Sequence, residues 1–260
     1  MFAQSDLTRD AFLCGRLHLW QPKQGYRAAT DPVLLAAACP AKPGQSVLDL
    51  GCGAGAASLC LATRVPDLRL FGLELQPDYA ELARQNAAEN GIGLRVVTAD
   101  LTDLPAELRL GFDHVIANPP YYPRGGTPSP QPGRDIALRA QTPLSVWIAV
   151  AARRLVPGGW LTLICGADGL PDVLSALGPA LGSALGPALG SASVLPLAPR
   201  ENRPALRVIV RARKGGRAAF RLLSPLVLHA GPTHDGDRES YTARANAVLR
   251  EGTDLCAEFS

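Results

Sequence analysis

Residues 47–55 read Val-Leu-Asp-Leu-Gly-Cys-Gly-Ala-Gly, and this stretch decides the fold. The apolar run before the first glycine is typical of a buried strand, and residues 56–65 follow it as a helix-like stretch. Glycines at alternate positions permit turns that other residues disfavour, and they let the backbone approach a ligand closely. The stretch therefore predicts a strand, a ligand-binding turn and a helix in succession, which is the opening unit of an α/β fold.

Four more strand-like runs follow, in alternation with helix-like stretches. Strands are expected at 68–74, 94–99, 112–117 and 160–165, and further helices at 31–39, 77–90 and 143–155. Such alternation predicts a doubly wound, mostly parallel sheet covered by helices. We expect Gly91 to end the helix at 77–90. Thr142 is expected to cap the helix at 143–155, with Pro143 at its first position.

The last part of the chain predicts an antiparallel hairpin. Two strand-like runs, 206–212 and 219–228, flank the glycine turn Lys214-Gly215-Gly216. This C-terminal hairpin would complete a seven-stranded sheet. Residues 1–40, with a small strand at 16–20, are expected to form an accessory segment packed on a core domain of residues 41–260.

Residues 175–192 are repetitive, because Ser-Ala-Leu-Gly-Pro-Ala-Leu-Gly at 175–182 recurs at 183–190. Glycine and proline in each unit exclude a long regular helix. Loop-closure entropy rises only slowly with length, so a surface loop tolerates such a duplication. We predict a loop without a binding role.

Composition is that of an ordinary globular protein, with 47% hydrophobic residues, 19% charged residues and a net charge of +3. No apolar stretch approaches the length of a membrane span, and residues 1–16 lack the apolar segment of a secretion signal. The six cysteines form no Cys-x-x-Cys pair, which argues against a zinc site or a disulfide framework. We expect a cytoplasmic protein without a metal or a membrane partner, and the oligomeric state stays open.

Basic residues gather between Arg200 and Arg221, where eight of them stand against a single acid, Glu201. Clustering of this kind favours contacts with the phosphates of a nucleic acid, although a solvated face of two strands would look the same. The candidate contacts are Arg203, Arg207, Arg211, Arg213 and Lys214.

Polar groups follow four successive strands at the point where each ends. They are Asp49, Glu74, Asp100 and the quartet Asn118-Pro119-Pro120-Tyr121. The glycine pattern and Glu74 alone also fit a dinucleotide-binding loop, so a nicotinamide-dependent oxidoreductase is a real alternative. Each acid could also serve only to cap the next helix.

The quartet at 118–121 shifts the balance toward another cofactor. Its prolines fix φ and lack N–H donors, and Asn118 is held extended by the proline after it. The result is a rigid turn that presents an amide, acceptor carbonyls and an aromatic ring. Such a turn suits a planar substrate that carries an amino group. A hydride-transfer enzyme does not require such a turn. Asp49 and Asp100 suit the amino-acid end and the adenine of S-adenosylmethionine.

On these motifs the chain resembles class I S-adenosylmethionine-dependent methyltransferases of the Asn-Pro-Pro-Tyr group, over roughly residues 12–250. That group modifies adenines of DNA, rRNA and tRNA and glutamines of proteins. Residues 21–27, 30–35, Tyr122 and 226–229 most resemble the bacterial methyltransferases that act on the adenine beside the anticodon of a valine tRNA. The chain departs from that pattern in its repetitive loop and in the tail at 231–237.

The resemblance implies a Rossmann-like methyltransferase fold that binds S-adenosylmethionine at the strand ends. The implied cofactor residues are Thr30, Asp31, Asp49, Gly51, Gly53, Gly55, Glu74, Asp100, Leu101 and Asn118. The implied catalytic residues are Asn118, Pro119, Pro120 and Tyr121. The Asn118 oxygen and the Pro119 carbonyl would accept hydrogen bonds from the reacting amino group, and Tyr121 would stack on the base.

The implied partner is RNA, in the first place the anticodon loop of a tRNA. Tyr122 would stack on RNA, and the loop at 123–132, with Arg124, Arg134 and Arg139 in it or just after it, would clamp the substrate. Alternatives with the same chemistry are methylation of DNA adenine or of a protein glutamine. A nicotinamide-dependent oxidoreductase and a non-catalytic RNA-binding module are alternatives of other classes.

Overall fold

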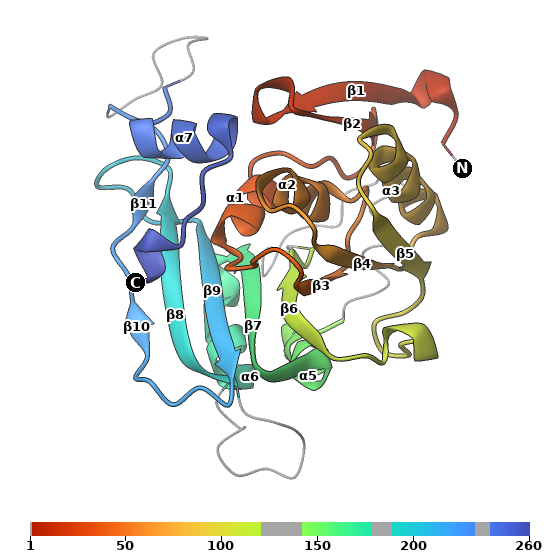
Figure 1. Cartoon of the computed structure of the whole chain (residues 1–260). Coiled ribbons are helices and arrows are strands. Elements are labelled where there is room, and N and C mark those ends of the chain that lie inside the picture. The colour runs from red at the N-terminus through yellow and green to blue at the C-terminus, as the bar shows by residue number, and fades with distance from the viewer. Residues whose placement is uncertain (1, 121–141, 178–188, 232–239) are drawn as a thin grey trace.

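A nine-stranded mixed sheet forms the middle of the molecule (Figure 1). The computed structural model describes residues 2–120, 142–177, 189–231 and 240–260. The strand order is β10-β8-β9-β7-β6-β3-β4-β5, and β11 pairs with β8. The bounds are β3 (Ser46–Leu50), β4 (Arg69–Glu74), β5 (Leu94–Thr98), β6 (Phe112–Ala117), β7 (Leu155–Gly166), β8 (Leu189–Ala198), β9 (Arg207–Lys214), β10 (Arg221–Leu222) and β11 (Leu226–Val227).

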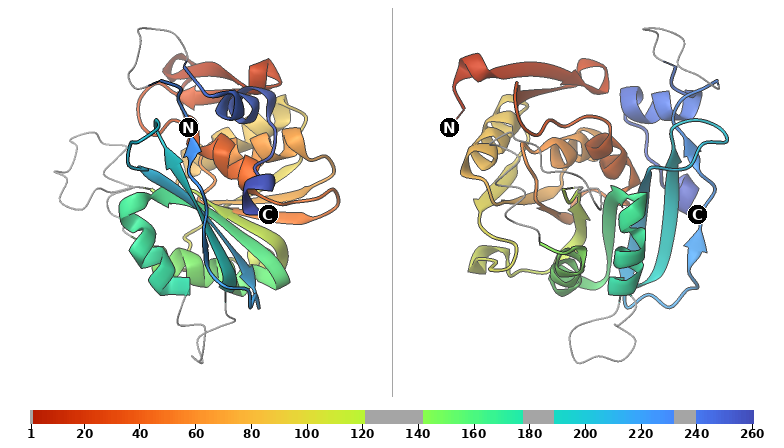
Figure 2. Two further views of the ribbon diagram at one scale, coloured as in Figure 1. Left: turned by 90° about the vertical axis from the view of Figure 1, so that its left-hand side faces the viewer. Right: turned by 180° about the vertical axis from the view of Figure 1, so that it is seen from behind.

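Helices cover both faces of the sheet, which gives three layers (Figure 2). One face carries α1 (Asp31–Ala38), α2 (Ala56–Arg64), α3 (Pro77–Glu89) and α7 (Ala243–Glu251). The other carries α5 (Leu144–Arg154) and α6 (Leu170–Leu177). Short 3₁₀ turns are η1 (Gln4–Asp6), η2 (Leu13–Gly15), η3 (Ala106–Leu108), η4 (Ala167–Gly169) and η6 (Ala257–Phe259). None of these described helices is long and apolar enough to cross a membrane.

The central strands are apolar along their length because both of their faces are covered. Every residue of β3 is buried, and β6 is buried except for the half-exposed Asp113. β5, β4, β3, β6 and β7 run parallel, so their carboxyl ends meet at one edge, called here the carboxyl edge. The doubly wound, mostly parallel sheet predicted from the sequence is confirmed, but it has nine strands rather than the seven predicted.

The N-terminal region forms a separate antiparallel hairpin of β1 (Leu7–Phe12) and β2 (Leu17–Pro22), which lies over α3 (Figure 1). The sequence predicted only the second of these strands. β1 reads Leu-Thr-Arg-Asp-Ala-Phe, which lacks the alternation of a half-buried strand, and only its first residue is buried.

The predicted C-terminal hairpin is wrong in its pairing. β9 pairs antiparallel with β7 on one side and with β8 on the other. The run expected at 219–228 supplies only β10 and β11, and both pair parallel with β8 rather than with β9. β8 takes the place beside β9 because residues 194–198 are apolar and mostly buried against it.

Two further expectations need correction. The repetitive segment is not all loop, because α6 extends to Leu177 and β8 begins at Leu189. Pro143, not Thr142, is the N-cap of α5, which begins at Leu144. In contrast, α3 ends as predicted: Gly91 has a φ of +64° and its N–H donates to the Ala88 carbonyl.

Candidate active site

The turn between β3 and α2 places three glycines at the carboxyl edge of the sheet. Gly51, Gly53 and Gly55 have φ angles of +67°, +55° and +87°. A Cβ atom on Gly51 would also lie 2.7 Å from the ring of Trp147 in α5. The conformation and the close approach at position 51 thus both require glycine.

Replacing Gly51 with alanine is expected to lower the free energy of unfolding by about 1–3 kcal/mol, through backbone strain and the clash with Trp147. Cofactor affinity should fall as well, because the turn must shift to relieve both. Denaturant unfolding and a binding titration measure the two effects. Gly93→Ala is the matched control. The backbone of Gly93 is not in the left-handed region, and a Cβ atom there would have no neighbour within 4 Å. Equal stability of the two variants would contradict the prediction.

Two buried carboxylates lie beside this turn. Asp49 is 2% exposed and accepts a hydrogen bond from the Ser58 hydroxyl at 2.7 Å. Burial raises the pKa of Asp49 to about 7, although the Ser58 hydrogen bond acts in the opposite direction. The Glu74 carboxylate accepts from the backbone N–H groups of Gly53 and Gln76, both at 2.9 Å, and burial raises its pKa too.

The charge of these carboxylates indicates the kind of ligand that fits. Among the ion pairs of the described residues, none involves Asp49 or Glu74, so no cation in that part of the chain pairs with them. S-adenosylmethionine carries a sulfonium and an ammonium group, and its ribose hydroxyls can donate to the remaining lone pairs of Glu74. A dinucleotide would instead bring a pyrophosphate anion to the glycine turn. The site therefore fits S-adenosylmethionine better than a nicotinamide cofactor.

The end of β5 contributes Asp100 and Leu101. The Asp100 carboxylate accepts from the backbone and the hydroxyl of Thr102, both at 2.7 Å, and these bonds lower its pKa. Leu101 is buried. Leu75, directly after Glu74, is 41% exposed and gives this edge an apolar surface that the sequence analysis did not single out. The adenine contacts of Asp100 and Leu101 stay predictions.

Asn118 follows β6 at the same edge, and its Nδ2 donates to the Tyr26 hydroxyl at 3.2 Å. Pro119 is buried and Pro120 is exposed. Tyr26 was not predicted as a site residue. It lies in the stretch 21–27, which indicated the family resemblance but no role for this tyrosine. Tyr121, Tyr122, Arg124, Arg134 and Arg139 lie outside the described residues, as do most of the repetitive loop and the tail after residue 231.

Thr30 and Asp31 stand at the start of α1. Thr30 is the N-cap residue, but its side chain makes no capping hydrogen bond. The Asp31 carboxylate pairs with Arg207 of β9, with Nε and Oδ2 3.3 Å apart. Because Arg207 lies opposite Gly166 at the carboxyl end of β7, this ion pair belongs to the carboxyl edge.

The basic cluster predicted at 200–221 does not form one surface. Arg203 is exposed in the connection between β8 and β9, which lies at the carboxyl edge beside Arg207. Arg213 and Lys214 lie at the far end of β9, about 20 Å away for six strand residues. There Arg213 donates to the Gly158 carbonyl and Lys214 to that of Leu155.

Arg211 is not a surface residue and so does not fit the predicted phosphate contact. It is 7% exposed, and its guanidinium lies 4.8 Å from the ring centroid of Trp160 and 4.4 Å from that of Phe259. Stacking between aromatic rings stabilises a buried guanidinium. Arg207, Arg211 and Arg213 share one face of β9, and the sequence signal failed because Trp160 and Phe259 pack over Arg211 in particular.

The parallel sheet, the glycine turn and the buried carboxylates together define a class I S-adenosylmethionine-dependent methyltransferase. A family model described as the methyltransferase small domain matches residues 29–171, and the chain belongs to that family. Where the structure is described, no group of three histidine, cysteine, aspartate or glutamate side chains could hold a metal ion.

Known proteins similar to the chain agree with this class. A tRNA1(Val) (adenine(37)-N6)-methyltransferase of Porphyromonas gingivalis is 36% identical over 174 residues, which cover 63% of this chain and 68% of the relative. A release factor glutamine methyltransferase of Deinococcus radiodurans is 34% identical over 139 residues, 50% of this chain and 49% of the relative. The crystal structure of a predicted O-methyltransferase from Agrobacterium tumefaciens has a TM-score of 0.67 and 26% identity, covering 86% of this chain and 98% of that one.

Proposed function

We propose that the protein transfers the methyl group of S-adenosylmethionine to the exocyclic amino group of an adenine in RNA, and that this RNA is the anticodon loop of a tRNA. The observation that carries the proposal is the position of Asn118, at the carboxyl edge beside the glycine turn and the buried carboxylates. The relative from Porphyromonas gingivalis, which bears the name of a tRNA adenine N6-methyltransferase, supports the choice of acceptor. A tRNA substrate would place the protein in the cytoplasm.

Bound S-adenosylmethionine supplies an electrophilic methyl group on its sulfonium. The amino group of adenine is a poor nucleophile because its lone pair is delocalised into the ring. Hydrogen bonds from that amino group to the Asn118 Oδ1 and the Pro119 carbonyl would localise the lone pair and orient it. Orientation of this kind supplies several kcal/mol in favourable cases. A strong general base is unnecessary, since the nitrogen becomes acidic as the new bond forms.

The carboxyl edge also suits an RNA loop. A base must leave its stack to reach Asn118, at a cost of a few kcal/mol, and an anticodon loop lowers that cost because its bases are accessible. Arg203 and Arg207 lie at the same edge and could contact the phosphates on either side of the flipped base.

The test is to incubate the protein with labelled S-adenosylmethionine and with RNA, DNA or protein from a strain that lacks the gene. Label in RNA, recovered as N6-methyladenosine after digestion, is the expected result. Sequencing of the labelled RNA then identifies the tRNA and the position. Label in protein alone would overturn the proposal in favour of a glutamine acceptor, which the relative from Deinococcus radiodurans would suggest.

Replacing Arg203 with alanine is expected to weaken RNA binding by a similar factor for all sequences. It should also reduce the slope of log affinity against log salt by about 1, since one phosphate contact is lost. Arg213→Ala, the same change at the far edge of the sheet, is the control and should leave the affinity and the slope unchanged. Equal losses in the two variants would refute a phosphate contact confined to the carboxyl edge.

A further inference from the structure

The segment between β2 and α1 carries Tyr26 into the active site, and the fold fixes its backbone. The Tyr79 hydroxyl accepts a hydrogen bond from the Tyr26 N–H at 2.9 Å and donates one to the Tyr26 carbonyl at 3.1 Å. Gly25, just before it, has a φ of +105°. One side chain of α3 thus satisfies both backbone groups of Tyr26, so the segment is held against α3 at this point.

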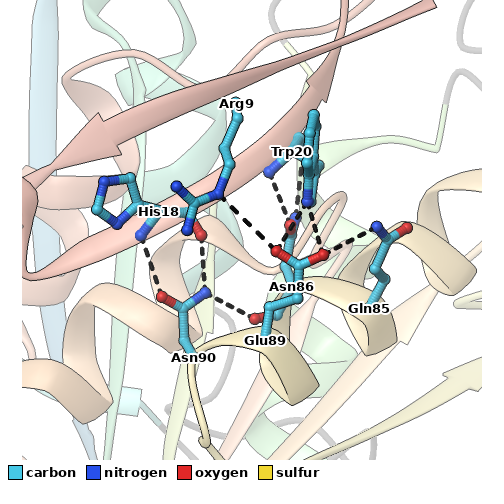
Figure 3. A network of polar contacts seen from close by, with 7 residues as sticks. All are labelled: Arg9, His18, Trp20, Gln85, Asn86, Glu89 and Asn90. Carbon is cyan, nitrogen blue, oxygen red and sulfur yellow. Dashed lines mark hydrogen bonds and ion pairs between the residues drawn. The ribbon is translucent and has the colours of Figure 1, made fainter. Parts of the chain in front are cut away.

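The hairpin that precedes this segment is docked on the same helix (Figure 3). Asn90 pairs with both backbone groups of His18, at 3.0 and 2.7 Å, and Asn86 with both of Trp20, at 2.7 and 3.1 Å. Asn86 in α3 and Asn90, the C-cap residue of α3, therefore pair with the backbone of β2 as a neighbouring strand would. The Trp20 indole N–H also donates to the Glu89 carboxylate.

The same interactions reach the glycine turn. Asn86 is fully buried, and its Nδ2 also donates to the carbonyl of Ala54 at 3.0 Å, between Gly53 and Gly55. Gln21 of β2 holds the end of the segment that follows Tyr26, because its amide oxygen accepts from the Ala28 N–H at 2.7 Å. The hairpin, α3 and the glycine turn therefore form one frame around Tyr26.

Within this frame the Tyr26 side chain lies between the cofactor turn and the catalytic asparagine. A Cβ on Gly53 would be 3.7 Å from its ring, and its hydroxyl accepts from the Asn118 Nδ2 at 3.2 Å. The direction of this hydrogen bond matters, because a carboxamide has a donor end and an acceptor end. With Nδ2 directed at Tyr26, Oδ1 is directed away from it.

We propose that Tyr26 is a positioning residue that fixes the orientation of the Asn118 carboxamide, so that Oδ1 faces the amino group to be methylated. The inference rests on the proposed function, because only an amino acceptor requires Oδ1 rather than Nδ2 at that point. A carboxamide turned by 180° would set Oδ1 against the lone pairs of the Tyr26 oxygen, and the hydrogen bond would be lost while the hydroxyl proton is directed elsewhere. The proposal also gives the accessory segment of residues 1–40 a part in the chemistry.

The charges around Tyr26 favour a hydrogen bond in which the Asn118 amide donates and the Tyr26 hydroxyl oxygen accepts. Burial of its hydroxyl end, followed by the carboxylates of Asp31 and Asp49, raises the pKa of Tyr26, although 52% of the whole residue is exposed. The hydroxyl therefore stays neutral at physiological pH. The negative charges of Asp31 and Asp49 would direct the hydroxyl proton toward these carboxylates, which would leave the oxygen as an acceptor for Asn118.

Tyr26→Phe tests the proposal, since it removes the hydroxyl and keeps the ring. We expect kcat to fall about tenfold, the upper range for one neutral hydrogen bond, while the Kd of S-adenosylmethionine changes less than twofold. Tyr241→Phe, the same change in a residue stacked on His229, is the control and should leave kcat unchanged. An unchanged kcat in Tyr26→Phe, or a loss confined to cofactor binding, would overturn the proposal.

A double-mutant cycle separates positioning from a structural role. In an Asn118→Ala background, Tyr26→Phe should have no further effect on single-turnover rates, because Tyr26 acts through the missing carboxamide. Additive losses would overturn the proposal.

The hydrogen bond itself can be observed without any substrate. The side-chain amide resonance that disappears in Asn118→Ala should shift and exchange faster in Tyr26→Phe, and an unmoved resonance would refute the contact. If the wild-type protein methylates no RNA, the proposed function fails. The resonance and the rates with the acceptor that is labelled then still decide the role of Tyr26.

Discussion

Alanine at position 118 is expected to slow methyl transfer by about 10²–10³-fold, the range seen when one preorganised polar group of an active site is removed. In the proposed function the Asn118 carboxamide accepts a hydrogen bond from the substrate amino group and frees its lone pair, so its loss should act mainly on the reacting state. Affinity for S-adenosylmethionine should change less than about twofold. The buried Asp49 and Glu74 carboxylates, which we expect to attract the cofactor, remain in place.

Single-turnover assays with saturating cofactor measure the rate, and a titration without substrate measures the affinity. Asn246→Ala is a suitable control, since Asn246 lies in α7, which packs against α1 and η2. Full activity of Asn118→Ala would show that the Asn118 side chain after β6 has no part in the chemistry. A comparable loss in the control variant would point to damage of the fold instead.

The parallel part of the sheet could be predicted because its signals are local. β3, β4, β5 and β6 are mostly apolar runs with clear ends. A parallel sheet covered by helices on both faces favours apolar residues throughout its strands. Once those strands are parallel, Asp49, Glu74 and Asn118 must gather at one edge. The site could thus be placed from the sequence although its members are far apart along the chain.

Contacts that depend on packing could not be predicted in this way. Asn118 and Tyr26 are 92 residues apart, and only the docking of the N-terminal hairpin on α3 brings them together. Arg211 has the same charge as Arg203, yet its place in the middle of β9 buries it between two rings. The pairing of β9 with β8 was missed because β8 begins inside the repeat, where composition indicated only a loop.

Asp49→Asn is expected to stabilise the fold at pH 8 while it removes most of the affinity for S-adenosylmethionine. The pKa of Asp49 is raised to about 7 in the folded protein, against an ordinary value of 3.8. Between these values the folded state holds a proton that the unfolded state releases. Its contribution to stability is therefore complete below about pH 4 and is lost as the pH rises through 7. A shift of about three pKa units corresponds to about 4 kcal/mol at most.

Urea unfolding at pH 4, 6 and 8 measures this term. The wild-type protein should lose stability across the range, and Asp49→Asn should lose much less. A slope of the same sign should persist in the variant, because burial also raises the pKa of Glu74. Asp103→Asn is the control, since 89% of the Asp103 side chain is exposed. Parallel curves for wild type and Asp49→Asn would contradict a raised pKa at this position.

Cofactor binding should show the opposite dependence on pH. A cationic ligand binds the ionised form of Asp49, so affinity should rise about tenfold per pH unit up to about pH 7 and then level off. Calorimetric titrations in buffers with different ionisation enthalpies would detect the proton released on binding. In Asp49→Asn both the release and the rise should become smaller, with only the part due to Glu74 left. The carboxylate that weakens the empty protein at neutral pH would then be the group that selects a positively charged cofactor.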